Sequence, residues 1–432
     1  MWAYWLFIAI EALFVNVMIP DGELALGDSV YITLILLNSV ILILTIVFTC
    51  RDRSYCLFLI GGFVLRLFFL FWSEYCSDIF LLPNSGADEM TYYYNAMSNL
   101  VKDKEFTGYA MLFSWQARIF GLSKIYGKFV NVLLSISAIM ILRKTLTLLD
   151  IRNNLRTRVL AIACFIPNYA ILSALLLRES IIVFLIAVSS YFLICWWKNG
   201  KLRDLLLSLL ASVGAAWLHS GMITYTLGII CIAISVQKAS GGFRFDLLRP
   251  RTILRSAIAF CIVLFLLMNL NFGITSYFKD ADSLEDIVAI ADAYEDGGSA
   301  YNANIVSNDS TLGFIINTPF RMFYFLFSPV PWNWRSATDA IAFFFSALFY
   351  GYIFIRTIPH LTKKHGFSLG SALFLIALLT LMMFGWGVSN SGTALRHRDK
   401  MVIHYLIMYA LLANEKYGRQ EPRQIRSCSD EI

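Results

Sequence analysis

Long apolar stretches recur along the whole chain, separated by mostly short polar connections. Many of them approach the ~20 residues that a helix needs to cross the hydrocarbon core of a bilayer. In lipid, every backbone polar group must be paired inside its own segment, so stretches of this length favour helices. We therefore expect an all-α polytopic membrane protein with about twelve transmembrane helices. They are expected at residues 3–19, 29–50, 55–73, 126–147, 157–177, 180–197, 204–218, 221–236, 254–271, 337–357, 367–387 and 400–414.

The charge of the connections alternates along the chain. Every second connection is basic, through Arg51 and Arg53; Arg143, Lys144, Arg152, Arg156 and Arg158; Lys198, Lys201 and Arg203; Lys238, Arg244, Arg249, Arg251 and Arg255; Lys363 and Lys364; and Lys416, Arg419, Arg423 and Arg426. Because cytoplasmic loops carry an excess of Lys and Arg, these connections and both termini are expected in the cytoplasm. The pattern predicts a single transmembrane domain over residues 1–415 and a cytoplasmic tail over 416–432.

Two long connections are then expected on the outer side, at about residues 73–125 and 271–336. Each contains an apolar stretch, Gly108–Gly121 and Leu312–Trp334, that is too short or too interrupted to cross the membrane. Aromatic residues mixed with polar ones favour the headgroup region of a bilayer. We expect both stretches to form helices that lie on the outer leaflet or dip into it.

Composition agrees with this interpretation and excludes a soluble protein. Of the 432 residues, 58% are hydrophobic and 15% are charged, whereas soluble domains carry about 25% charged residues. The basic residues behind the net charge of +6 lie in short connections, as topology requires, so they do not indicate a nucleic-acid partner. Most of the 8 Cys lie inside apolar stretches, without the spacing of a disulfide framework or a metal site.

Several basic residues depart from the alternation, because they lie at the expected outer ends of helices. A charge near the hydrocarbon is costly and usually serves a function, and Arg presents a planar fork that matches phosphate oxygens. We therefore expect a site for a lipid-linked phosphate or pyrophosphate. Its candidate residues are Arg178, His219, Arg321, Arg335, Arg396 and Arg398. The alternative is that these side chains anchor helix ends or pair with acidic residues.

The segment Asn84–Tyr94 (NSGADEMTYYY) places two adjacent carboxylates, Asp88 and Glu89, in the first outer connection. A carboxylate near an apolar boundary can act as a general base, and the three tyrosines that follow suit the apolar faces of sugars. The alternative is a solvated loop in which Asp88 caps the following helix. Two carboxylates without a third ligand are weak evidence for a metal.

Two further segments are candidates for the same outer site. Leu177–Ser180 (LRES) places Arg178 beside a glutamate at the membrane edge, where a structural ion pair is an equally good interpretation. Pro319–Arg335 contains three prolines together with Trp332 and the two arginines named above. Prolines at membrane depth free backbone carbonyls, which are tolerated at a polar cavity, so we expect this segment to form a cavity wall.

Other chemistry is not indicated by the sequence. There is no P-loop motif for nucleotide phosphates and no Cys/His spacing for a metal, so neither a metal nor another cofactor is expected. Glu11 and Arg66 are charges inside expected spans, where they line a transport path or face the interior of the bundle.

The outer segments together resemble a known group of membrane enzymes. The matching pieces are Gly86–Tyr94, Ile119–Gly121, Leu177–Ser180, Ser328–Arg335 and Gly392–Lys400. In layout they resemble the O-antigen and capsule repeat-unit polymerases of bacteria and the related GT-C glycosyltransferases. The loop with the two carboxylates follows the third expected span here, whereas in GT-C enzymes the catalytic acidic residue is in the first outer loop.

The resemblance implies glycosyl transfer from a polyprenyl-linked donor to a glycan acceptor at the outer face of the bacterial cytoplasmic membrane. It implies that Asp88 or Glu89 is the catalytic base. It also implies that Arg396, His397 and Arg398 engage the pyrophosphate, with Arg178, His219 and Arg321 in support, and that no metal is needed. It further implies contact with membrane lipid, and it allows a chain-length regulator as a protein partner.

Two other functions remain open at this point. A GT-C-type transferase would add a single sugar from a polyprenyl monophosphate donor. A flippase for lipid-linked oligosaccharide would carry the substrate across, and it would be expected to show internal repeats and charges along a central path.

Overall fold

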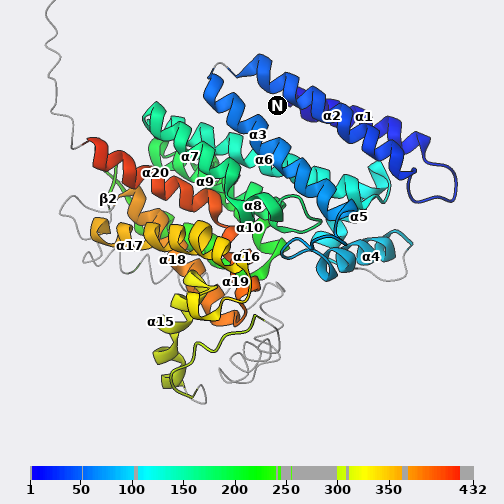
Figure 1. Ribbon diagram of the computed structural model, residues 1–432. Coiled ribbons are helices and arrows are strands. Elements are labelled where there is room, and N and C mark those ends of the chain that lie inside the picture. The colour runs from blue at the N-terminus through cyan, green and yellow to red at the C-terminus, as the bar shows by residue number, and fades with distance from the viewer. Residues whose placement is uncertain are drawn as a thin grey trace, which may run out of the picture.

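The computed structural model describes residues 2–50, 52–101, 106–239, 242–244, 254, 299–307, 311–361 and 368–418. Within these ranges the chain is helical apart from one short hairpin (Figure 1). Six helices are long and apolar enough to cross a membrane: Asp28–Thr49, Arg53–Tyr75, Lys124–Leu148, Glu179–Asn199, Ala337–Pro359 and Leu369–Gly387. The expected helix at 254–271, much of the outer connection 271–336 and most of the tail 416–432 lie outside the described residues.

The N-terminal part contains α1 (Trp2–Met18), α2 (Asp28–Thr49), α3 (Arg53–Tyr75), α4 (Ala87–Val101), α5 (Tyr109–Phe120) and α6 (Lys124–Leu148). Polar residues set the start of the long helices. Asp52 accepts a hydrogen bond from Tyr55 N at 3.2 Å, and Ser123 accepts one from Tyr126 N at 3.3 Å, as N-caps do. Between α5 and α6 the chain turns at Gly121, whose φ of +81° suits glycine. The apolar stretch 108–121 is thus a helix, as predicted.

The middle of the chain contains α7 (Asn153–Phe165), α8 (Pro167–Leu172), α9 (Glu179–Asn199), α10 (Leu202–Leu218), the 3₁₀ turn η1 (Ser220–Met222), α11 (Ile223–Ser235) and the antiparallel strands β1 (Gln237–Ala239) and β2 (Gly242–Arg244). The C-terminal part contains α15 (Thr311–Phe327), η3 (Pro331–Asn333), α16 (Ala337–Ala342), the π-helical segment η4 (Phe343–Ala347), α17 (Leu348–Leu361), α18 (Leu369–Gly387), α19 (Ser391–Asp399) and α20 (Val402–Gly418). The second outer stretch is therefore helical over α15, which contains Pro319, and mostly irregular from Ser328 to Trp334.

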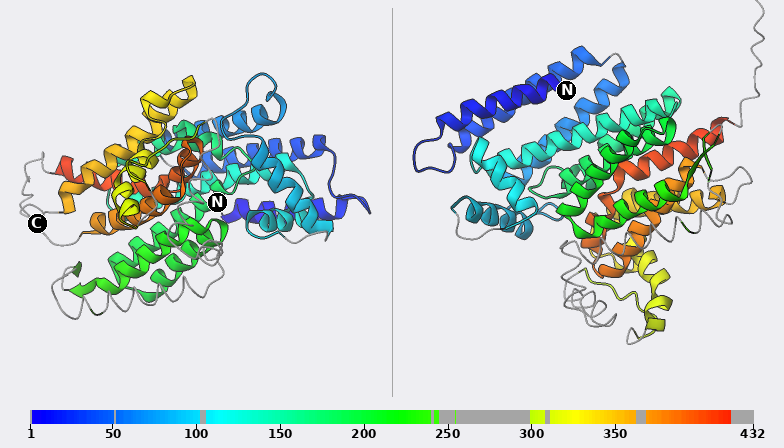
Figure 2. Two further views of the ribbon diagram at one scale, coloured as in Figure 1. Left: turned by 90° about the horizontal axis from the view of Figure 1, so that it is seen from below. Right: turned by 180° about the vertical axis from the view of Figure 1, so that it is seen from behind.

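Helices α6, α9 and α20 form the centre of the bundle. Each packs against the other two, and α7, α17 and α18 also pack against α20. Figure 2 shows α6 between α1–α3 on one side and the paired helices α9 and α10 on the other. Apolar side chains on the outer faces of α1 and α2 are exposed, among them Leu13, Phe14 and Phe48. This is the arrangement expected where lipid, not water, surrounds the helices.

The single span expected at 157–177 is wrong in one respect: the structure breaks it into α7 and α8. Pro167 has no N–H to donate to Ala163 O, and a proline disfavours helical backbone in the residue before it. The guanidinium of Arg66 in α3 supplies the missing donors, from Nη1 to Cys164 O at 2.8 Å and from Nη2 to Ala163 O at 3.4 Å. Arg66 is fully buried, so this intramembrane charge joins α3 to the end of α7.

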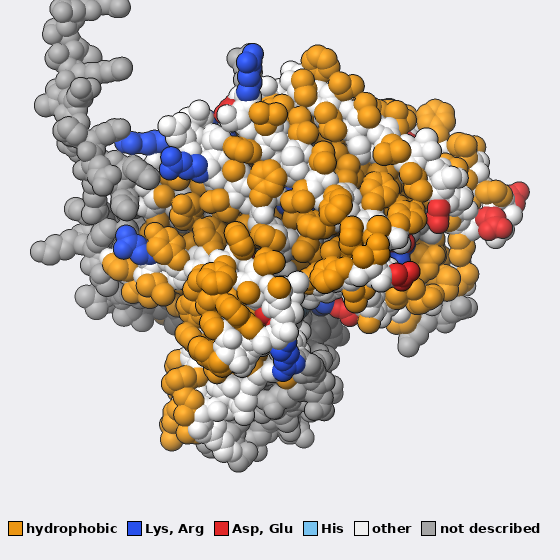
Figure 3. All heavy atoms as spheres, viewed as in Figure 1, with side chains coloured by type: hydrophobic (Ala, Val, Ile, Leu, Met, Phe, Trp, Pro, Cys, Tyr) orange, Lys and Arg blue, Asp and Glu red, His pale blue; other side chains and the backbone are white. Residues whose placement is uncertain are grey.

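Contacts divide the connections into two groups at opposite ends of the bundle. At one end Lys198, after α9, donates to Leu148 O and to Asp150 Oδ2 in the connection after α6. At the other end Leu122 N donates to Leu24 O at 2.7 Å, which joins the α5–α6 turn to the α1–α2 connection. Figure 3 shows a broad apolar surface between them, with basic side chains mostly toward the end of α20 and acidic ones toward the α1–α2 connection.

We predict that Arg66→Met destabilises the protein by about 3 kcal/mol or more, because each buried acceptor left without a donor costs about 1–3 kcal/mol. Thermal unfolding of the purified protein in detergent measures the change. Arg53→Met is the control: Arg53 is exposed at the start of the same helix, so we expect a change within about 0.5 kcal/mol. Equal unfolding midpoints for wild type and Arg66→Met would contradict this role.

Candidate functional site

The short helix α19 carries five consecutive charged or titratable residues, from Arg396 to Lys400, into the protein. Asn390 caps its start by accepting hydrogen bonds from Gly392 N at 2.9 Å and Thr393 N at 3.2 Å. The chain ahead of α19 is fixed by pairing with the stretch that follows residue 298, where Tyr301 N donates to Ser389 O at 2.8 Å. These contacts fix α19 so that its last turn, from Arg396 onward, faces the first residues of α4 and α9.

Arg396 lies between two carboxylates from distant parts of the chain. Its Nη1 pairs with Asp88 Oδ2 in the first turn of α4, and its Nη2 lies 3.0 Å from Glu179 Oε1 at the first residue of α9. Only 14% of the Arg396 side chain is exposed, against 53% of that of Asp88. These carboxylates raise the pKa of the Arg396 guanidinium above its ordinary value, although burial acts in the opposite direction. Arg396 therefore stays a cation at any working pH.

Two histidines lie next to this ion-pair cluster. His219 in the α10–η1 turn and His397 of α19 place their Nε2 atoms 3.1 Å apart, and Lys400 Nζ lies 3.1 Å from Nδ1 of His397. Burial lowers the pKa of both imidazoles well below 6.5, and the nearby Arg178 and Arg396 act in the same direction. Both histidines are therefore neutral near pH 7. A neutral imidazole can accept or relay a proton in this position.

The two adjacent carboxylates of the first outer connection have different roles in the structure. Glu89 is buried: its Oε1 accepts a hydrogen bond from Leu176 N at 2.7 Å and lies 3.2 Å from Lys128 Nζ. Lys128 also lies 2.9 Å from Glu74 Oε2, so Glu89 joins α4 to α3 and α6. Asp88 faces Arg396 and is half exposed. Asp88 is therefore the carboxylate that a substrate can reach.

Three of the sequence-predicted arginines bind backbone carbonyls at the C-terminal ends of helices. Arg178 Nη1 donates to Leu218 O of α10 at 3.2 Å, and Arg321 Nη1 donates to Trp386 O of α18 at 3.0 Å. Arg398 Nη1 donates to Phe325 O and Leu326 O of α15, at 2.9 and 2.7 Å. The last carbonyls of a helix have no partner within it, and a cation there also suits the helix dipole. These contacts fit the first part of the alternative, in which arginines anchor helix ends. The ion pairs of Arg396 with Asp88 and Glu179 fit its second part, pairing with acidic residues.

The remaining two candidates lie on the surface. Trp332 is 66% exposed in η3, and Arg335 is exposed just ahead of α16, where its backbone N–H donates to Asp339 Oδ2 at 2.9 Å. No described contact joins either side chain to the cluster around Arg396. The structure thus brings together Asp88, Arg178, His219, Arg396 and His397, and places Glu89, Arg321, Arg335, Arg398 and Trp332 in other surroundings.

A groove of about 680 Å³ adjoins this cluster, within the range of ligand-binding pockets. Aromatic side chains of α3 line one wall, among them Phe68, Phe69 and Trp72, and the α7–α8 break and η4 line another. Gly392 and Leu395 of α19 also line the groove, and Leu395 precedes Arg396 in the chain. The lining is mostly apolar, and the one charged residue described in it is Asp339. Such a groove suits an apolar tail.

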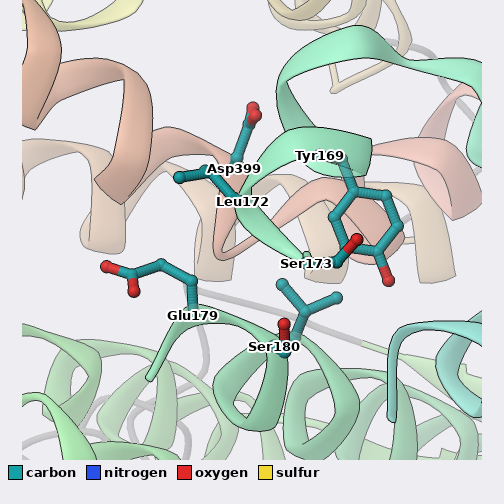
Figure 4. A pocket seen from close by; sticks show the side chains of 7 residues that line it. Tyr169, Leu172, Ser173, Glu179, Ser180 and Asp399 are labelled. Atoms are coloured by element: carbon teal, nitrogen blue, oxygen red, sulfur yellow. The ribbon is translucent and has the colours of Figure 1, made fainter. Parts of the chain in front are cut away.

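A second, much smaller pocket, with no room for a water molecule, lies between α8, α9 and α19 (Figure 4). Two buried oxygens at its edge, Glu179 Oε2 and Ser180 Oγ, have no hydrogen-bond partner among the described residues. In Figure 4 the Glu179 carboxylate points away from Tyr169 and Ser173, which lie across the pocket. One carboxylate oxygen of Glu179 thus binds Arg396 while the other is uncommitted.

Three residues that complete the site are not among the predicted site residues: Glu179, Lys400 and Lys128. Glu179 and Lys400 lie inside the segments LRES and GTALRHRDK that the sequence already singled out. Lys128 lies inside the apolar stretch of α6, where a lone lysine at a buried position was the available signal. Among the described residues no group of three or more His, Cys, Asp or Glu side chains could hold a metal ion.

No protein-family model matches this chain, and searches of curated proteins and of solved structures also gave no match. The interpretation of the site therefore rests on its own geometry. That geometry offers one reachable carboxylate, one permanently cationic guanidinium, two neutral imidazoles and an apolar groove beside them.

We predict opposite outcomes for the two adjacent carboxylates. Glu89→Gln removes a charge that faces buried Lys128 and should destabilise the protein by about 1–3 kcal/mol. Asp88→Asn removes a partly exposed ion pair and should change stability by less than about 1 kcal/mol. Thermal unfolding of both variants under one condition measures this. A larger loss for Asp88→Asn than for Glu89→Gln would contradict the assignment.

Because His219 and His397 are neutral in the folded protein, we predict that the protein becomes less stable at acidic pH. Because the pKa of each imidazole is lower in the folded protein than in the unfolded chain, the unfolded chain binds more protons between those two values. The stabilisation from the neutral histidines is then fully present above pH ~6.5 and is lost as the pH falls below that value. For each histidine, the unfolding equilibrium constant rises by up to about tenfold per pH unit. Unfolding midpoints from pH 7.5 to pH 5 measure this slope, and it should decrease in His397→Gln. An unchanged slope in that variant would show that His397 is already protonated.

Proposed function

We propose that the protein is a membrane glycosyltransferase that polymerises polyprenyl-pyrophosphate-linked oligosaccharide repeat units of a surface polysaccharide. The observation that carries the proposal is the placement of Arg396. Its guanidinium contacts carboxylates from α4 and α9, and the residue before it in the chain, Leu395, lines the apolar groove. A guanidinium in such a place can exchange a carboxylate for the oxygens of a phosphate, which it binds in the same bidentate way.

The groove supports a lipid-linked donor rather than a soluble one. Its aromatic wall, with Phe68, Phe69 and Trp72, suits the methyl-branched hydrocarbon of a polyprenyl chain, and α19 also contributes to the lining. In this arrangement the lipid lies along α3 and the pyrophosphate meets Arg396. The acceptor sugars lie over α4, where Tyr92, Tyr93 and Tyr94 come one helical turn after Asp88.

The chemistry proposed is an inverting transfer without a metal. Asp88 or His397 removes the proton from the acceptor hydroxyl, whose oxygen attacks the anomeric carbon. The bond from that carbon to the pyrophosphate breaks, and Arg396 stabilises the negative charge on the departing group. Asp88 becomes available as a base when the pyrophosphate takes its place on Arg396.

The membrane topology proposed with this function has about twelve crossings, with both termini in the cytoplasm. The six long apolar helices supply part of that number, and the shorter apolar helices Tyr4–Met18, Ser220–Ser235 and Val402–Asn414 are further candidates. The sorting of connections into two groups supports it, because His219, Arg396 and Asp88 all come from connections that the charge pattern assigns to the outer side. The membrane proposed is the bacterial cytoplasmic membrane.

Deletion of the gene in its host, with the surface glycan analysed on a gel, tests the proposal. A glycan ladder that collapses to a single lipid-linked repeat unit identifies a polymerase. A ladder that persists but lacks one branch sugar identifies a single-sugar transferase with a polyprenyl monophosphate donor. Repeat units trapped on the cytoplasmic side identify a flippase.

We predict that Arg396→Ala does not restore the ladder in the deletion strain although the protein reaches the membrane, with a loss of at least about 100-fold in transfer. Arg396→Lys, which keeps the charge but not the fork, should recover only part of it. Arg118→Ala is the matched control, because Arg118 is an exposed arginine of α5 on the same expected side. Wild-type ladders from Arg396→Ala would refute the role of this residue.

A further inference from the structure

A chain of hydrogen bonds leads from a backbone amide to a buried lysine. Gly221 N lies 3.2 Å from His219 Nδ1, the two histidine Nε2 atoms lie 3.1 Å apart, and His397 Nδ1 lies 3.1 Å from Lys400 Nζ. Both imidazoles are partly exposed, whereas Lys400 is fully buried. The chain thus connects the surface of the site with its interior.

The backbone N–H of Gly221, at the start of this series of hydrogen bonds, determines which nitrogen of each histidine carries a proton. A backbone N–H can only donate, so His219 Nδ1 is the acceptor and the proton of neutral His219 is on Nε2. That proton is donated to His397 Nε2, and neutral His397 therefore carries its own proton on Nδ1. The Nδ1–H faces Lys400 Nζ, so the lysine nitrogen must accept. Only the neutral amine has a lone pair with which to do so, because an ammonium has three donors and no acceptor.

The surroundings of Lys400 are compatible with a neutral resting state. The titratable and charged groups around it are Arg178 and Glu179 at the start of α9, His219 ahead of η1, and Arg396 and His397 of α19. Glu179 Oε1 is 3.9 Å from Lys400 Nζ and is already paired with Arg396 at 3.0 Å. The ring of Phe384 in α18 lies 5.6 Å away. Burial at the α19–α20 junction lowers the pKa of the Lys400 amine well below its ordinary value.

We propose that Lys400 rests as a neutral amine and is the proton acceptor of this site, acting through the imidazole of His397. The acceptor hydroxyl first displaces His219 from His397 Nε2. His397 Nε2 then takes the hydroxyl proton as that O–H bond breaks, and the Nδ1–H bond breaks as its proton passes to Lys400 Nζ. His397 is neutral again, and the new ammonium faces Glu179. The source of the proton rests on the proposed glycosyl transfer, whereas the resting charge of Lys400 does not. Lys400 is a positioning residue, since it reaches the substrate only through His397.

This transfer changes the contact between the two histidines. Before it, His219 Nε2–H donates to a bare His397 Nε2; after it, both Nε2 atoms carry hydrogen and the hydrogen bond is lost. The charge on Lys400 and the closure of the pair formed by His219 and His397 are therefore linked. The pair is closed when no acceptor is bound and Lys400 is neutral, and it stays open for as long as Lys400 is an ammonium.

The resting charge of Lys400 is measured by proton linkage. If Lys400 is neutral in the folded protein and charged in the unfolded chain, unfolding takes up one proton at this residue between about pH 7 and pH 9. The unfolding equilibrium constant of wild type then falls with rising pH more steeply than that of Lys400→Met, by a further factor of about ten per pH unit. Lys128→Met is the matched control, because Lys128 is an equally buried lysine that lies within 3.2 Å of two carboxylates. Lys128→Met is expected to keep the wild-type slope. Unfolding of the full-length protein in detergent, followed at several pH values, gives all three slopes.

Equal slopes for wild type and Lys400→Met would overturn the proposal by showing a charged lysine. Should Lys400→Met not fold, Lys400→Gln takes its place, since an amide oxygen can accept the His397 Nδ1–H bond. This measurement does not use the transfer reaction, so it is decisive even if the proposed function fails.

The second readout is the pH profile of glycan transfer in membranes from the complemented host. The wild-type rate should rise with pH as Lys400 loses its proton, whereas Lys400→Gln and the permanently charged Lys400→Arg should lose at least about tenfold and lack that rise. Wild type could show the additional pH dependence of unfolding while Lys400→Gln keeps the wild-type transfer rate and pH profile. That result would confirm a neutral Lys400 but overturn its role as proton acceptor. Loss of transfer in Arg396→Ala alone bears on the proposed function and not on Lys400.

Discussion

The last carbonyl groups of a helix have no partner within that helix, and inside a membrane bundle no bulk water reaches them. In this protein cationic side chains from neighbouring elements supply the donors. Arg66 serves the end of α7, Arg178 that of α10, Arg321 that of α18, Arg398 that of α15 and Lys198 that of α6. Each interaction fixes one helix end against another element. The relative positions of the helices, and hence the site between them, depend on this use of charge.

Helix α19 shows what that constraint does to the site. Its consecutive residues contact different elements: Arg396 reaches α4 and α9, His397 reaches the turn ahead of η1, and Arg398 reaches α15. Asp399 accepts hydrogen bonds from Asn168 in α8 and from Ser346 in η4, and Lys400 faces α9. One turn and a half of helix thereby joins segments that are far apart in sequence. A displacement of α19 would move the guanidinium, the imidazole and the edge of the groove together.

Much of the helix pattern could be predicted from the sequence, because length and apolar character decide where a helix can cross a bilayer. The starts of α3 and α6 follow from Asp52 and Ser123, and the two amphipathic stretches are helices. The break at Pro167 was not predicted, since the apolar run continues through it and the compensating donor, Arg66, is about a hundred residues away in the chain. The sequence likewise identified the outer arginines as candidates, but it could not show which of them bind carbonyl groups and which bind carboxylates. Whether an arginine meets a carbonyl or a carboxylate depends on which helix end lies beside it.

The same distinction explains why Asp88 and Glu89, adjacent and chemically alike, differ in their roles. Successive residues of a helix point about 100° apart, so α4 can turn only one of them toward the bundle interior. Glu89 takes that direction and meets Lys128 and Leu176 N, which leaves Asp88 at the edge with Arg396 as its described partner. A base paired with a guanidinium is inactive until another anion displaces it. In the transfer proposed for this site the donor pyrophosphate is the anion that binds Arg396, so the release of Asp88 would follow donor binding rather than precede it.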